Sequence, residues 1–116
     1  MIEVDYYDLP NGGKPAEEFI NQLELKMRVK IAGMIAVLKQ KGHMMREPYS
    51  KNMGHGIFEL RVKYAGDIAR VFFFYTADKK AILTNGIIKK TEKTPPNALA
   101  LARKYKAEYD RRVKNG

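Results

Sequence analysis

Residues 56–88 read GIFELRVKYAGDIARVFFFYTADKKAILTNGII, and this stretch decides the fold. In GIFELRVKY, apolar and charged side chains alternate, which is the pattern of a strand with one buried face. IARVFFFY and AILTNGII are rich in aromatic and β-branched residues, which favour strands. The turn-forming segments AGD and ADKK separate three predicted strands, which we expect to form an antiparallel meander. Their predicted ranges are 56–64, 68–75 and 81–88.

The flanking segments predict an α+β fold. Residues 2–7 alternate as a strand, and apolar residues recur at helical spacing over 15–41. That length favours a hairpin of two helices with a break near 24–28. Residues 43–56 are expected to be a loop, and Thr94 is expected to cap a last helix. The predicted order is β-α-α-β-β-β-α, with helices on one sheet face and the other face free for a ligand.

Composition narrows the class of protein. A chain of 116 residues fits a single domain over 1–116. It has no cysteine and two histidines, so we predict neither disulfides nor a metal site, and no cofactor. No apolar run reaches the ~18 residues of a membrane span. The acidic start MIEVD is unlike a signal peptide. We therefore expect a cytoplasmic protein without membrane contact.

The charge of the chain favours a polyanion as its partner. The formal net charge is +9, and a strongly basic small domain is typical of nucleic-acid binding. Charge alone does not distinguish DNA, RNA and an acidic protein. The alternative is a basic but merely solvated surface.

Two arginines interrupt the predicted strands. Arg61 shares a strand face with Glu59 and Lys63, so its side chain should leave the core. Arg70 lies within an apolar run, and an unpaired buried guanidinium is costly. It must therefore face solvent, a carboxylate or a ligand. An internal ion pair of Arg70 with Glu59 or Asp67 and a ligand-binding role carry equal weight at this point.

Further basic residues lie outside the strand interiors. Lys89, Lys90 and Lys93 lie between the last strand and the last helix. Lys51 and the aromatic Tyr49 lie in the predicted loop before the central strands. Cations near an aromatic ring suit single-stranded nucleic acid, because the charges bind phosphates and the ring stacks on a base. Each residue taken singly fits a solvated surface equally well.

Three motifs together resemble a known family. The motifs are ELR (residues 59–61), the arginine that precedes an aromatic run (Arg70), and KKTEKTP (residues 89–95), which leads into the last helix. With the order of elements, they resemble the HigB-like, phage-derived branch of the RelE/ParE toxin superfamily over essentially the whole chain. The resemblance implies a RelE-like β-α-α-β-β-β-α fold.

The resemblance also implies a function. It implies the toxin of a type II toxin–antitoxin system, a metal-independent endoribonuclease that inhibits translation by cutting mRNA on the ribosome. In this reaction the ribose 2′-OH attacks the adjacent phosphate. A cognate helix-turn-helix antitoxin would silence the toxin, and DNA would be contacted only through that antitoxin.

The resemblance assigns candidate catalytic residues. Arg61, Arg70 and either Lys89 or Lys90 occupy the places of the family's catalytic basic residues, and we take Lys90 as the candidate. Lys51, Lys63, Lys89, Lys93 and Tyr49 are candidate RNA-binding residues. Glu59 departs from the lysine of the RelE type, and the C-terminal tyrosine of some members has no counterpart. The general base therefore stays open between Glu59 and a lysine.

Two other functions remain open. ParE-type relatives poison DNA gyrase, but they tend to lack the basic residues on the central strands. A non-catalytic module that binds nucleic acid or an antitoxin would use the same basic surface. The nuclease hypothesis expects Arg61 and Arg70 to project together into one open, cation-lined hollow. It would fail if the two side chains pointed to different faces, or if internal carboxylate pairs held them with no concavity beside them.

Overall fold

A mixed five-stranded sheet forms the centre of the molecule, which is a computed structural model that describes residues 1–115. The strand order is β1-β5-β4-β3-β2. The antiparallel meander β3-β4-β5 is confirmed, and β1 adds to it parallel to β5. The elements are β1 (Glu3–Tyr6), α1 (Pro15–Asn21), α2 (Leu25–Lys41), the 3-10 turn η1 (Gly42–Met44), β2 (Ser50–Asn52), β3 (Phe58–Tyr64), β4 (Asp67–Tyr75), β5 (Lys80–Lys89) and α3 (Pro96–Asn115).

The predicted helical hairpin is confirmed, but its break comes earlier than expected. Helix α1 ends at Asn21, and the N–H groups of Gln22 and Leu23 donate to carbonyls three residues back. This tight turn is a common way to satisfy the last carbonyls of a helix. Helix α2 already begins at Leu25, at the start of the range in which the break was predicted.

The expected loop 43–56 contains a strand. Its three residues SKN form β2 by pairing antiparallel with residues 58–60 of β3. They show no apolar alternation, so the strand exists through its partner and not through its own pattern. The prediction that Thr94 caps α3 is also wrong. The helix begins at Pro96, and the Thr94 hydroxyl donates to Glu59.

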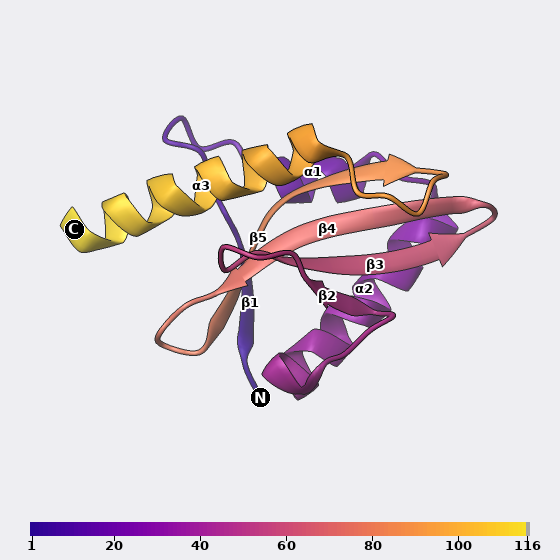
Figure 1. Ribbon diagram of the computed structural model, residues 1–116, viewed down its shortest axis with the longest axis horizontal. Helices are drawn as coiled ribbons and strands as arrows, with labels where there is room; N and C mark the ends of the chain where they lie inside the picture. Colours follow the sequence, from indigo (N-terminus) through magenta and orange to yellow (C-terminus); the bar gives the residue numbers. More distant parts are fainter. Residues whose placement is uncertain (116) are drawn as a thin grey trace.

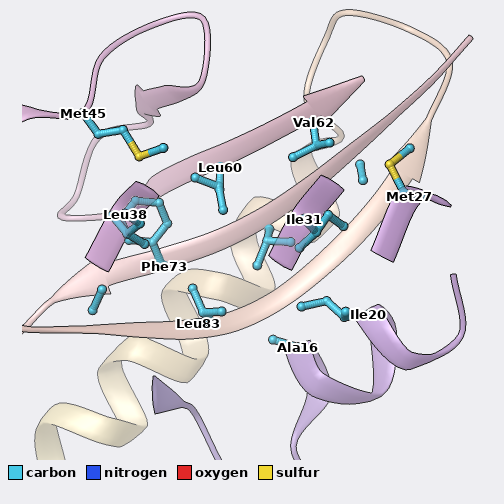
Figure 2. Packing of buried hydrophobic residues seen from close by; sticks show 13 residues of the cluster. Ala16, Ile20, Met27, Ile31, Leu38, Met45, Leu60, Val62, Phe73 and Leu83 are labelled. Atoms are coloured by element: carbon cyan, nitrogen blue, oxygen red, sulfur yellow. The ribbon is translucent and has the colours of Figure 1, made fainter. Parts of the chain in front are cut away.

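Helices cover both faces of the sheet, which corrects the expectation of one free face. Helices α1 and α2 pack on one face around a core that includes Ile31, Leu60 and Phe73 (Figure 2). Helix α3 runs along the other face, and Figure 1 shows it on the opposite side of the sheet from α2. Aromatic contacts of Tyr7 with Tyr105 and of Phe74 with Tyr109 anchor α3 there. Both tyrosines of α3 are partly buried and pack against the apolar cluster on this face.

The molecule is compact. The Cα radius of gyration is 13.4 Å, close to the ~13 Å expected for a folded domain of about 100 residues. Among the described residues, no helix combines the length and the apolar character that a membrane crossing requires.

Candidate nucleic-acid interface

The two strand arginines lie directly opposite each other. Arg61 of β3 pairs with Arg70 of β4 in the antiparallel register, and cross-strand partners point to the same sheet face. This face is the one that carries α3, because Phe72 and Phe74 of β4 belong to the apolar cluster under that helix. Like charges directly opposite destabilise a sheet, so the arrangement requires a negative charge nearby.

Glu59 supplies that charge from within the sheet. Its side chain is fully buried, and it precedes Arg61 by two residues on the same strand face. One carboxylate oxygen, Oε1, accepts a hydrogen bond from Nε of Arg61 at 3.0 Å. The other, Oε2, accepts one from the Thr94 hydroxyl at 2.5 Å and lies 3.5 Å from Nε of Arg70. A buried carboxylate with this many partners is a counter-ion, and the structure argues against its use as a general base.

Arg70 is enclosed by the fold. Its side chain is fully buried, and its NH2 donates to the carbonyl of Thr91. Within residues 1–115, its Nε and NH1 have no hydrogen-bond partner. Burial lowers the pKa of the guanidinium, while the charge of Glu59 acts in the opposite direction. The prediction that both guanidinium groups face an open hollow is therefore wrong for Arg70. Of the alternatives that the sequence left open for this residue, the structure shows the internal ion pair with Glu59.

Arg61 occupies the boundary between this buried network and the surface. Its side chain is 15% exposed. On the outer side, NH1 donates to Oε2 of Glu92 at 3.1 Å, and NH2 donates to the main-chain oxygen of Glu92 at 3.0 Å. Lys63, two residues further along β3, donates to Oε1 of Glu92 at 2.8 Å. Glu59 thus orients Arg61 from below, while the outer edge of the guanidinium faces the surface.

A groove of about 290 Å³ lies beside Arg61 at the edge of the sheet. Strand β2 pairs with only the first part of β3, and the N–H of Arg61 donates to the carbonyl of Tyr49 just beyond it. The groove begins where this pairing ends. Its lining residues come from α2, the segment before β2, and β3: Lys30, Met34, Pro48, Tyr49, Arg61, Val62 and Lys63.

The groove combines three cations with apolar and aromatic side chains. Lys30, Arg61 and Lys63 carry the charges, and Tyr49 is 54% exposed. Of these, the sequence prediction missed Lys30 and the neighbouring Met34. They are four residues apart and therefore lie on one helix face. This i, i+4 spacing is the only sequence signal that places the two side chains together. It does not show which strand that face of the helix contacts.

The other predicted residues surround the network without joining it. Lys51 is exposed on β2 opposite Glu59 in the register, and Lys89 is exposed at the end of β5. Lys90 lines a second hollow of about 290 Å³ together with Lys63 and Glu92. Lys93 is exposed in the same connection. The structure thus brings Arg61, Lys63 and Tyr49 to one groove and Lys90 to its neighbour. Their roles in RNA binding or catalysis remain predictions.

The fold and the interface define a small basic α+β protein with a cationic groove at a sheet edge. The family model described as phage-derived protein Gp49-like (DUF891) matches residues 18–107. The match covers most of the chain, so the protein belongs to this family, which is a branch of the RelE/HigB-like toxins. It includes α2, the whole meander and the first half of α3. Among curated proteins, none matches the sequence.

Proposed function

We propose that the protein is the toxin of a type II toxin–antitoxin system and that it cleaves mRNA without a metal, on the ribosome. Membership of the Gp49-like branch supports the toxin role. The observation that carries the nuclease role is the orientation of Arg61. A buried carboxylate holds this arginine at the boundary of the fold, where the residue lines a groove with two lysines and an exposed tyrosine. The RelE-like β-α-α-β-β-β-α order, to which β2 is a short addition, is part of this proposal.

The reaction assigned to the groove is an internal transesterification. The ribose 2′-oxygen attacks the adjacent phosphorus, and the bond from phosphorus to the 5′-oxygen breaks. The products are a 2′,3′-cyclic phosphate and a 5′-hydroxyl, so no external reagent is consumed. Arg61 stabilises the extra negative charge of the transition state, because a guanidinium remains charged and can grip two phosphate oxygens. Arg70 acts only by positioning Glu59 and the connection to α3.

Proton transfer is assigned to lysine amines. Glu59 is enclosed, so the base that takes the 2′-OH proton and the acid that protonates the 5′-oxygen must come from the surface. Lys63 and Lys90 line the same hollow and are the candidates. Lys51, Lys89 and Lys93 bind the flanking phosphates, and Tyr49 stacks on an unpaired base.

The proposed partners follow from the same surface. The substrate is single-stranded mRNA, presented by the ribosome. A helix-turn-helix antitoxin covers the cationic groove and links the pair to DNA. The site of action proposed for the whole system is the cytoplasm.

The test is cleavage of a translated mRNA, mapped by primer extension, with wild type, Arg61→Ala, Arg61→Lys and Lys104→Ala. Lys104 is an exposed residue of α3 and controls for the loss of one positive charge. We expect Arg61→Ala to lose cleavage, Arg61→Lys to retain a small part of it, and Lys104→Ala to cleave normally. All-deoxy substrate should remain intact, because it lacks the attacking 2′-OH.

A folded Arg61→Ala protein with wild-type cleavage would refute the proposal. So would intact mRNA together with inhibition of gyrase in a supercoiling assay, which would assign the ParE-type function instead. Weaker RNA binding in Arg61→Ala, with no cleavage by any variant, would identify a non-catalytic binding module.

A further inference from the structure

The Arg61–Lys63 pair already binds an anion, and this anion is a side chain of the protein. Oε2 of Glu92 accepts from NH1 of Arg61, and Oε1 accepts from Nζ of Lys63. The Glu92 side chain is 67% exposed in the connection between β5 and α3. It is therefore held by charge and hydrogen bonds more than by packing. The hydrogen bond from Lys63 lowers the pKa of the Glu92 carboxyl, so the group carries a full negative charge at neutral pH.

The geometry of this contact matches a phosphodiester. Two oxygens of one anionic group bridge a guanidinium and an ammonium, which is how the two non-bridging oxygens of a phosphate would bind. Arg61 and Lys63 are two residues apart on one strand, so they project from the same face. Glu59 fixes the inner side of Arg61 in either case.

We propose that Glu92 occupies the place of a substrate phosphate, and that RNA binds only by displacing this carboxylate. The inference rests on the function proposed above for the identity of the ligand as RNA. It adds that in the free protein the Glu92 carboxylate occupies the anion site and competes with the substrate for it. Glu92 then sets the affinity of the toxin for its substrate, and a phosphate group must replace both of its hydrogen bonds.

Displacement of Glu92 does not require the loop to unfold. The main-chain oxygen of Glu92 accepts separately from NH2 of Arg61 at 3.0 Å. Thr91 and Thr94 on either side bind Arg70 and Glu59. These contacts stay in place when the carboxylate turns towards solvent. A substitution of Glu92 should therefore change the anion site and leave the fold intact.

The first experiment uses inorganic phosphate as the probe and the full chain as the protein. Backbone amide shifts of β3 are followed by NMR during titration of wild type, Glu92→Gln and Glu24→Gln. Glu24 is an exposed residue that precedes α2 and forms no ion pair within the described residues, so it controls for the change in net charge. Two exposed ion pairs predict about 3- to 10-fold tighter binding for Glu92→Gln. Glu24→Gln should match wild type.

A second variant protects the test against an unexpected change of structure. Glu92→Asp keeps the charge on a shorter side chain that cannot bridge both cations. It should bind phosphate with an affinity between those of wild type and Glu92→Gln. Equal phosphate affinity of wild type, Glu92→Asp and Glu92→Gln would overturn the inference.

The second experiment separates this inference from the nuclease proposal. Binding of a single-stranded 2′-O-methyl RNA, which cannot be cleaved, is measured by fluorescence anisotropy with the same proteins. Glu92→Gln should gain the same factor as with phosphate. Tighter phosphate and RNA binding without cleavage of ordinary RNA by any variant would support the inference and refute only the nuclease role. Tighter phosphate binding without any gain for RNA would refute the role of Glu92 in substrate binding.

Discussion

Glu59→Gln should be among the most destabilising single-atom changes in the protein. It replaces one carboxylate oxygen by nitrogen and keeps the shape of the side chain, so packing is unchanged. It removes the negative charge next to Arg70, whose side chain is as completely buried as that of Glu59. Removal of one partner from a buried ion pair costs about 3–5 kcal/mol, because the other charge remains uncompensated. The loss of stabilising energy at Arg61 is smaller, since this side chain is partly exposed and keeps its contacts with Glu92.

We place the expected loss at the lower end of that range, about 3 kcal/mol, because the amide oxygen of glutamine can still accept a hydrogen bond from Arg61. In a protein of this size, such a loss lowers the Tm by about 10 °C. Thermal unfolding followed by circular dichroism, with urea unfolding as a second measure, tests this value.

The double variant Glu59→Gln/Arg70→Met tests the reason for the loss. Methionine removes the buried positive charge, so charge and counter-charge disappear together. The double variant should therefore be more stable than the sum of the two single effects allows. A loss below about 1 kcal/mol in Glu59→Gln, or strict additivity in the double variant, would show that the pair does not stabilise the sheet as argued.

Two further predictions concern packing and pH. Gly86→Ala should cost about 1–3 kcal/mol, because an added Cβ would lie 2.3 Å from Cδ2 of Phe19. Gly33→Ala on α2 meets open space and should instead stabilise by about 0.5–1 kcal/mol; urea unfolding compares the two, and equal effects would contradict the packing argument. Burial and the hydrogen bond to Glu108 raise the pKa of Tyr7 from 10.0 to about 12. The stability from its protonated phenol is therefore fully present below pH 10.0 and is lost as the pH rises towards about 12. In an alkaline titration followed by phenolate absorbance, Tyr7→Phe should remove the part of the absorbance rise that occurs at the highest pH. Loss of a part that occurs at lower pH would contradict the raised pKa of Tyr7.

Much of the fold could be predicted because local patterns report which side chains are buried. The alternation in FELRVKY predicted both the strand and the face on which Arg61 lies, and the aromatic run around Arg70 predicted β4. A strand with one buried face has apolar side chains at every second residue. A few neighbouring residues are therefore enough to predict the strand and its buried face. The helical hairpin followed from the same kind of local periodicity.

The candidate site was only partly predictable, because its contacts join residues that are distant in the sequence. The pattern left Arg70 open between an ion pair and a ligand. The structure decided it when the connection after β5 brought Thr91 and Thr94 over Glu59 and Arg70. The groove likewise needs Lys30 of α2 to meet β3, and this depends on how the helix packs on the sheet.

The sequence by itself determined the helices, the strands other than β2 and the charged positions within them, since each depends on the energetics of neighbouring residues. Only the tertiary structure decided that Arg70 is enclosed while Arg61 reaches a groove. The two arginines lie opposite each other in the register. The connection between β5 and α3 covers Arg70, whereas Arg61 lies beside the edge of the sheet. Whether a guanidinium contacts a carboxylate or solvent is set by segments that come from elsewhere in the chain, and a local pattern does not contain that information.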